Sequence, residues 1–218
     1  RYYQMMGYDT FYLTGTDEHG ENIMRVAREQ GKTEQQLVDE NSAHFRSLWP
    51  KFHVHQDDFI RTTEPRHAKV VQAILADLFA KNEIYKASYE GDYCVQCERF
   101  YTEKEMDEKR PGICPTHETK LQRIQEENYF FRMSRYQDYL RKKIESEPDF
   151  INPPQFANEV LGILRDPLDD LCISRPKARL PWGIEIPFDP NYVVYVWFDA
   201  LVNYISALGY PDGELYEE

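Results

Sequence analysis

The sequence predicts an α/β fold that carries a small metal-binding insertion, and two observations lead to this prediction. The first is that two short apolar segments, Phe11–Gly15 and Val193–Phe198, are each followed by a helical segment. Such segments form β-α steps, in which polar residues after the strand face a ligand crevice. The second is a set of cysteine and histidine residues between positions 94 and 117, with the spacing of a structural zinc site.

The composition limits the size, the partners and the compartment of the protein. The 218 residues are enough for one large or two modest domains, and 41% of them are hydrophobic. The net charge of −12 excludes a global basic surface for nucleic acid, so we expect no DNA partner and only local patches for RNA. Four cysteines, three of them in the zinc pattern, favour a reducing compartment, and we expect a cytoplasmic protein. We find neither a signal peptide nor an apolar run of about 18 residues, so we expect no membrane partner.

The first predicted β-α step contains a candidate ligand-binding carboxylate. We expect residues 1–8 to end a helix, Phe11–Gly15 to form a strand and Glu21–Gln30 to form the next helix. Asp17 lies between this strand and this helix, where its carboxylate could pair with a substrate ammonium group. Alternatively, Asp17 and Glu18 cap the helix and suit its dipole, and spacing alone does not choose between the two interpretations.

The next segments are predicted to be scaffold. Residues Thr33–Trp49 carry apolar side chains at helical spacing, and an extended segment follows at Asp57–Thr63. A third helix begins near this point, with Pro65 in its first turn and a wide apolar stripe along Val70–Phe79. Nothing in these segments indicates chemistry.

The stretch from Cys94 to His117 predicts a closed zinc site. Cys94 and Cys97 form one knuckle, Cys114 and His117 form a second, and sixteen residues separate them. Two residues lie between the ligands of each knuckle, so a tight turn can aim both side chains at one point. The surrounding residues 87–127 are charged and poor in apolar runs, so metal binding would supply much of their folding free energy. The alternative of a redox pair needs an accessible thiol of low pKa, which metal ligation would remove.

Short strands and helices are predicted around and after the knuckles. A capping-box sequence at 102–105, Thr102-Glu103-Lys104-Glu105, predicts the start of a short helix, and Asn128–Arg132 reads as a strand. Helices are then expected over Ser134–Ser146 and from Pro154 to Arg165.

Basic side chains gather in one segment of this acidic chain. They are Arg132, Arg135, Arg141, Lys142 and Lys143, against the single acidic residue Asp138. Such a cluster is a candidate phosphate-contact face. An ordinary solvated helix face is the alternative, and the sequence leaves both open.

A second β-α step is predicted near the end of the chain. Asp170–Arg175 reads as extended, and Pro181–Pro187 reads as a turn with a short strand. The continuous apolar run Val193–Phe198 is typical of a buried parallel strand, and a helix is expected over Leu201–Leu208. If both steps belong to one parallel sheet, Asp17 and Trp197 lie at the same edge of that sheet.

Five groups of residues, in this order, carry a resemblance to a known family: Thr14–Gly20, the two knuckles, Asn128–Arg132, Ile173–Arg175 with Trp182–Ile184, and Tyr195–Ala200. Along essentially all 218 residues the chain resembles the class I aminoacyl-tRNA synthetases, namely methionyl-tRNA synthetases of the bacterial type with one zinc knuckle. The resemblance implies a Rossmann-like catalytic domain that is split by a connective insertion. Residues 1–87 would belong to the first half, with its start missing, residues 88–172 to the insertion, and residues 173–218 to the start of the second half.

The activity implied by this resemblance is that of a ligase. Such enzymes activate L-methionine with ATP and Mg²⁺ to methionyl-adenylate, and they transfer the methionyl group to the 3′ end of tRNA(Met). Two signatures of the class, His-x-Gly-His and Lys-Met-Ser-Lys-Ser, do not occur in this sequence. We expect them before Arg1 and after Glu218, so we expect an internal fragment that is inactive alone. The alternative is a zinc-ribbon module that binds RNA or protein without catalysis, which would explain the knuckles but not the two β-α steps.

The resemblance also implies roles for individual residues. Asp17 would face the methionine ammonium group, and Arg175 would be an arginine needed for activation. The walls of the methionine pocket would be Trp197, Ala200, Leu201 and Tyr204. Aromatic walls suit a polarizable thioether. The basic segment would approach the acceptor end of tRNA, and the structural zinc would take no part in the reaction.

Overall fold

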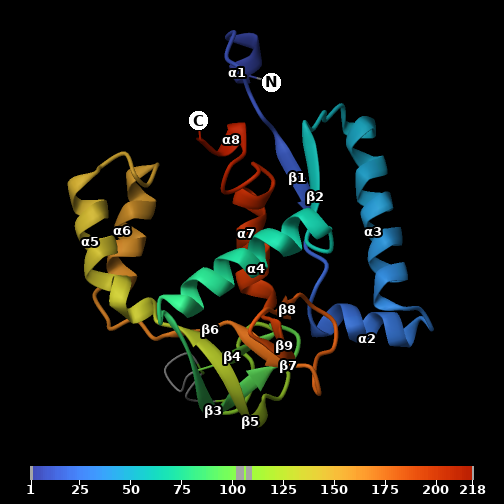
Figure 1. Ribbon diagram of the computed structural model, residues 1–218, viewed down its shortest axis with the longest axis vertical. Helices are drawn as coiled ribbons and strands as arrows, with labels where there is room; N and C mark the ends of the chain where they lie inside the picture. Colours follow the sequence, from blue (N-terminus) through green and yellow to red (C-terminus); the bar gives the residue numbers. More distant parts are fainter. Residues whose placement is uncertain (1, 102–105, 107–109, 218) are drawn as a thin grey trace.

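The computed structural model describes residues 2–101, 106 and 110–217, which form a mixed α/β structure (Figure 1). The helices are α1 (Tyr2–Met5), α2 (Glu21–Glu29), α3 (Glu34–Leu48), η1 (Trp49–Phe52), α4 (Pro65–Ala80), η3 (Met133–Tyr136), α5 (Gln137–Ser146), α6 (Pro154–Ile163), α7 (Val196–Ser206) and α8 (Glu214–Glu217). The strands are β1 (Leu13–Thr16), β2 (Asp58–Arg61), β3 (Ile84–Cys94), β4 (Arg99–Tyr101), β5 (Gln122–Phe131), β6 (Leu171–Cys172), β7 (Ser174–Pro176), β8 (Glu185–Ile186) and β9 (Asp189–Val194).

The strands of the described residues pair in three separate sheets. β1 and β2 are parallel, with Gly15 opposite Ile60. The second sheet has the order β4-β3-β5-β6, and the third has the order β7-β9-β8; the pairs in both are antiparallel. The long β3–β5 ladder extends away from α4 and carries the first knuckle at its far end, while α5 and α6 project on another side (Figure 1).

One apolar core joins α4, α7 and the two antiparallel sheets. Val71 and Leu75 of α4 are fully buried against Ile173, Val194 of β9 and Val202 of α7. Burial of each such aliphatic side chain contributes about 1.5–3 kcal/mol. This core positions α7, and with it the candidate pocket residues that α7 carries.

Several predicted elements are confirmed. The helix expected over Thr33–Trp49 is α3, and a capping box closes its start: Gln36 N–H donates to Thr33 Oγ1 over 3.2 Å, and Thr33 N–H donates to Gln36 Oε1 over 3.0 Å. Pro65 opens α4, as expected, because the first helical position needs no N–H donor. The first strand lies two residues later than expected at its start.

The prediction of a buried parallel strand over Val193–Phe198 is wrong. β9 ends at Val194 and pairs antiparallel with β7 and β8, and the rest of the apolar run begins α7. A short apolar run suits a buried strand and a buried helix equally well, so its periodicity could not separate them. The expectation that Asp17 and Trp197 share one edge of a single parallel sheet is wrong for the same reason, since β1 and β9 belong to different sheets.

Two expectations concern other parts of the chain. The short helix expected at 102–105 lies outside the described residues. In the part of the chain that the structure describes, none of the helices is both long and apolar enough to cross a membrane.

Candidate functional site

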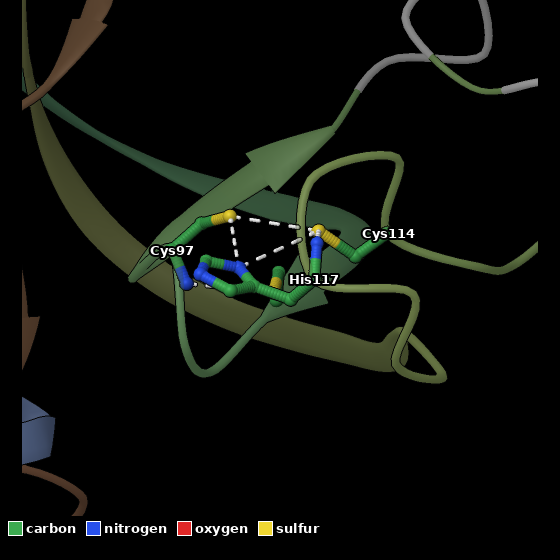
Figure 2. Close-up of side chains that lie close together, drawn as sticks. Cys97, Cys114 and His117 are labelled. Carbon is green, nitrogen blue, oxygen red and sulfur yellow. Dashed lines mark hydrogen bonds between the residues drawn. The ribbon is translucent and has the colours of Figure 1, made fainter.

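The four predicted metal ligands converge on one point next to the β3–β4 turn. Figure 2 shows three of them, Cys97, Cys114 and His117. The ligand atoms of Cys94, Cys97, Cys114 and His117 all lie within 4.8 Å of one another. Cys97 Sγ lies 3.1 Å from His117 Nδ1 and 3.5 Å from Cys114 Sγ. A tetrahedral site with metal–sulfur bonds of about 2.3 Å has sulfur atoms about 3.8 Å apart, so the observed spacing is suitable. These four residues could therefore hold a metal ion.

The two knuckles have the same local geometry. The N–H of Cys97 donates to Cys94 Sγ over 3.4 Å, and the N–H of His117 donates to Cys114 Sγ over 3.4 Å. Burial tends to raise the pKa of Cys114, but hydrogen bonds from the His117 N–H and with the Tyr101 hydroxyl lower it to about 6. Burial raises the pKa of Cys97 to about 11. A divalent cation between the sulfurs would favour the thiolate of both, which is the form that binds metal.

Glu18 stabilises the loop that follows β1. Its carboxylate accepts hydrogen bonds from Arg61 Nε and Thr16 Oγ1, each over 2.7 Å, and from the Thr63 hydroxyl. Its carbonyl oxygen accepts a hydrogen bond from Trp182 Nε1 over 2.7 Å. A buried carboxylate needs such partners. Glu18 therefore fixes the loop, and it makes no capping hydrogen bond to α2.

His19 joins the same loop to α7. Its Nδ1 lies 2.6 Å from Asp199 Oδ2, and both side chains are buried although 180 positions separate them in the sequence. Burial raises the pKa of Asp199, and the hydrogen bond to His19 opposes the rise. Among the described residues, Asp199 Oδ1 has no hydrogen-bond partner. A buried polar pair thus holds the loop after β1 against the beginning of α7.

Asp17 lies beside this pair, in a hollow of about 200 Å³. The hollow is lined by β1 on one side and by Asn203 and Tyr204 of α7 on the other. Burial raises the pKa of Asp17 to about 7, and the nearby carboxylate of Asp199 adds to the rise. The side chain keeps an exposed face, so water screens part of this effect. A cation in the hollow would favour the ionised carboxylate.

The predicted pocket walls lie along α7. Helical spacing places Trp197, Leu201 and Tyr204 on one face, and their exposed fractions are 53%, 66% and 65%. Ala200 is half-buried. Trp197 lines a second hollow of about 900 Å³, together with Arg175. The structure therefore brings Asp17 and Tyr204 to one hollow, and Arg175 and Trp197 to another.

Arg175 is buried, with only 2% of its surface exposed. Its Nη1 donates to the Ser174 carbonyl over 2.7 Å and to Cys172 Sγ over 3.1 Å, and the guanidinium lies 3.9 Å from the centroid of the Tyr195 ring. In the described structure Nε and Nη2 have no hydrogen-bond partner. An incompletely paired guanidinium that lines a hollow can accept an anionic group.

The basic segment is largely paired within the chain. Arg135 Nη1 lies 3.1 Å from Glu83, and Arg141 Nη2 lies 3.4 Å from Asp138. Lys143 pairs with Glu147 over 2.9 Å, and the guanidinium of Arg132 lies over the ring of Tyr85. Lys142 has no ion-pair partner among the residues that the structure describes. Most of this surface charge is therefore balanced locally.

Three buried residues of the site were not predicted from the sequence: His19, Glu98 and Asp199. His19 and Asp199 lie within the motifs Thr14–Gly20 and Tyr195–Ala200 and next to or near predicted site residues, which was the available signal. Glu98 directly follows a metal ligand, and nothing in the sequence indicates that its carboxylate reaches the N-terminus of α2.

Comparison with known proteins gives consistent results. The family described as tRNA synthetases class I (M) matches residues 1–125 and 110–218. A relative named Methionine–tRNA ligase from Clostridium acetobutylicum is 47% identical over 221 residues, which cover 100% of this chain and 34% of the relative. A relative of the same name from Caldanaerobacter subterraneus subsp. tengcongensis is 45% identical over 210 residues, which cover 96% and 32%. The chain thus spans about a third of the length of these curated relatives.

Solved structures give the same result. The structure of Mycobacterium tuberculosis methionyl-tRNA synthetase bound by methionyl-adenylate aligns with a TM-score of 0.89 and 36% identity, over 98% of this chain and 43% of that one. The apo form of the same protein aligns with a TM-score of 0.75 and 30% identity, over 95% and 47%. Identity at this level along nearly the whole chain does not favour a zinc-ribbon module without catalysis.

Proposed function

Because this chain belongs to the family of class I tRNA synthetases (M), we propose that it is part of a methionine–tRNA ligase. The full-length ligase would activate L-methionine with ATP, with Mg²⁺ as the metal of the nucleotide, and transfer it to the 3′ end of tRNA(Met). The observation that carries the proposal is the hollow shared by Asp17 and Tyr204, in a chain that is similar to such ligases throughout. The chain alone lacks the two phosphate-binding signatures of the class, so we propose that it is inactive by itself.

Asp17 would bind the ammonium group of methionine. Near neutral pH its raised pKa leaves the carboxylate only partly ionised in the empty hollow. An ammonium group within about 4 Å would stabilise the ionised form and gain a charge-assisted hydrogen bond. The buried pair His19–Asp199 and the hydrogen bonds of Glu18 would hold Asp17 in place for this contact.

The exposed face of α7 would enclose the methionine side chain. Trp197, Leu201 and Tyr204 present apolar surface with Ala200 between them, and a thioether packs favourably against aromatic rings. An apolar pocket of this kind discriminates between similar side chains by only about 1–3 kcal/mol. The carboxylate of Asp17 would therefore be needed to select for an amino acid.

Arg175 would act through its charge in the activation step. Arg175 lines the hollow of about 900 Å³, where its positive charge could stabilise a carboxylate or a phosphate group of the reactants. Burial beside Tyr195 keeps the guanidinium in one position.

We further propose that the metal of the two knuckles is zinc with a structural role. Three sulfur ligands and one imidazole are the donors that structural zinc prefers, and four protein ligands leave no open position for a reactant. The knuckles would belong to a connective insertion at residues 88–172, between a first catalytic half at 1–87 and the start of a second half at 173–218.

The proposal is tested by replacing Asp17 with alanine in the full-length ligase that contains this chain. Methionine-dependent pyrophosphate exchange should fall by about 100-fold or more, because the contact to the ammonium group is lost. The exposed Asp9→Ala variant is the matched control and should keep full activity. Normal pyrophosphate exchange in Asp17→Ala would contradict the assignment.

Contact of the basic segment with the acceptor end of tRNA is a separate proposal. It rests on Arg141 and Lys142, two exposed side chains that are neighbours in the segment. The double variant Arg141→Glu/Lys142→Glu should weaken tRNA(Met) binding and reduce its dependence on salt concentration. Binding and salt dependence equal to those of the unchanged ligase would show that this face is merely solvated.

A further inference from the structure

We infer that Glu98 is a positioning residue that connects the metal knuckle to both elements of the candidate methionine site, the loop before α2 and the beginning of α7. The inference rests on the proposed function. Glu98 directly follows the ligand Cys97 and does not line the hollow of Asp17 and Tyr204, so it would act on methionine only through its neighbours.

The carboxylate of Glu98 serves as the cap of α2. Its Oε1 accepts a hydrogen bond from the N–H of Asn22 over 2.7 Å, and the side chain is 8% exposed. The residue at the N-cap position is Gly20, which has no side chain that could accept this bond. The first N–H groups of a helix lack partners within the helix and favour a negative charge. Glu98, from another part of the chain, therefore supplies the hydrogen-bond acceptor and the negative charge that the N-cap residue of α2 cannot provide.

The approach of Glu98 also accounts for Gly20. This glycine has a φ of 112°, and a Cβ at this position would lie 2.5 Å from Glu98 Oε2. Both the backbone conformation and the space taken by the carboxylate therefore disfavour a larger residue. In addition, Asn22 Nδ2 donates to the carbonyl of Gln96, inside the first knuckle, over 3.2 Å. The first knuckle and the start of α2 thus touch through two side chains.

The backbone of Glu98 contacts the second element. The hydroxyl of Tyr195 donates a hydrogen bond to the Glu98 carbonyl. Tyr195 is the N-cap residue of α7, and its ring supports the guanidinium of Arg175 at 3.9 Å. One residue beside the knuckle therefore holds the beginnings of both α2 and α7.

Metal binding would fix this arrangement. Glu98 has a left-handed backbone conformation, with a φ of 53°, immediately after Cys97. Such a conformation persists in a non-glycine residue only where the surroundings impose it. A metal bound to Cys97 would hold the turn, and with it the carboxylate and carbonyl of Glu98. Loss of the metal should then loosen α2 and α7 at their first residues, although the metal is not part of the pocket.

The test compares Glu98→Ala and Glu98→Gln with Glu118→Ala in the full-length ligase. Glu118 is the matched control because it follows the ligand His117, has a φ of 54° and is exposed. Metal content, hydrogen exchange of the Asn22 amide, and the KM and kcat for methionine activation are measured for each. A merely structural role would change stability without a selective change at Asn22 or in KM.

We expect about one metal ion per chain in all three variants. In Glu98→Ala the Asn22 amide should exchange roughly tenfold faster, and the KM for methionine should rise by about tenfold or more. Glu98→Gln keeps an acceptor oxygen and should restore most of both values, and Glu118→Ala should match the unchanged protein. Chelation of the metal should also accelerate exchange at Asn22.

Normal exchange at Asn22 and a normal KM in Glu98→Ala would overturn the inference. If Glu98→Ala does not fold, a chelated sample of the unchanged protein decides: hydrogen exchange at Asn22 that is no faster after chelation would overturn the inference as well. Absence of methionine activation in the unchanged full-length protein would instead overturn the proposed function. The exchange measurement would still decide whether Glu98 couples the knuckle to α2.

Discussion

The two knuckles of the candidate metal site are alike in local structure and different in their surroundings. Both contain an N–H that donates to the first sulfur over 3.4 Å, and both are followed by a glutamate with a left-handed backbone. Glu98, after the first knuckle, is 8% exposed and contacts α2 and Tyr195. The side chain of Glu118, after the second knuckle, is 70% exposed and forms a surface ion pair with Arg110 over 2.9 Å.

The difference shows that ligand geometry and coupling to the rest of the fold have separate origins. A tight turn with two residues between its ligands builds the same half-site wherever it occurs. Whether the turn also stabilises other elements depends on what packs against it. Of the two knuckles, only the first contacts the segment from Asp17 to Asn22 among the described residues, so changes around the two knuckles should have unequal effects.

The largest effect should come from the loss of a ligand in either knuckle. Cys97→Ser and Cys114→Ser should each reduce the metal content from about one ion per chain toward zero. The apparent binding free energy of a structural zinc ion is about 10–16 kcal/mol, so the residues around the knuckles should unfold locally. Elemental analysis and hydrogen exchange would measure both effects.

Cys172→Ser is the control for the ligand variants, because Cys172 Sγ contacts Arg175 and lies outside the cluster. It should keep its full metal content. Full metal content in Cys97→Ser as well would exclude the four-ligand site.

Substitution of two glycines compares the surroundings of the two knuckles without changing a metal ligand. Gly20→Ala would place a Cβ 2.5 Å from the Glu98 carboxylate, at a φ of 112°. Gly112, before the second knuckle, has a φ of 74° and nothing within 4 Å of an added Cβ. We therefore expect Gly20→Ala to lower the free energy of unfolding by about 3 kcal/mol and Gly112→Ala by about 1 kcal/mol. Chemical denaturation would measure both values. Equal losses of unfolding free energy would mean that the Glu98 side chain moves aside at little cost.

A pH dependence of stability should arise on the side of the first knuckle. The pKa of Asp17 rises from 3.8 to about 7 in the folded chain, so between these values the folded state holds a proton that the unfolded state has lost. Stability contributed by this group is therefore lost as the pH rises from about 4 to about 7. The Asp17→Asn variant lacks this titrating group. The free energy of unfolding of the variant, relative to that of the unchanged protein, should therefore increase over this pH range.

The expected gain in Asp17→Asn is near zero at pH 4 and about 1–2 kcal/mol at pH 8, since water screens the exposed face of the side chain. Urea denaturation at a series of pH values would measure it. A difference that does not change with pH would contradict the raised pKa. The same variant should lose methionine activation, so stability and activity would change in opposite directions.

The smallest effect is expected at the second knuckle. Glu118→Ala removes only an exposed ion pair, so the free energy of unfolding should change by less than about 0.5 kcal/mol. Glu98→Ala removes a helix cap and should cost about 1 kcal/mol or more. Thermal denaturation of the two variants side by side would show the difference, and similar values would remove the distinction between the knuckles.

Much of this protein could be predicted from local patterns in the sequence. The convergence of the metal ligands followed from their spacing, because a four-residue turn leaves its side chains little choice of direction. The long helices followed from their apolar periodicity, as α3 and α4 show. The α/β class followed from segments that alternate between strand and helix patterns.

Only the tertiary structure decided how these parts meet. The apolar run that begins at Val193 was read as one strand, but the core of α4 and β9 uses its first part as strand and its remainder as helix. The pair His19–Asp199 and the bond from Asn22 to Glu98 join positions 180 and 76 residues apart. Such contacts produce no periodic pattern in the sequence, because each depends on where the fold of the whole chain places one buried polar group. The sequence by itself therefore determined the convergence of the four candidate metal ligands, the long helices α3 and α4, and the fold class, whereas packing decided which buried groups face one another at the site.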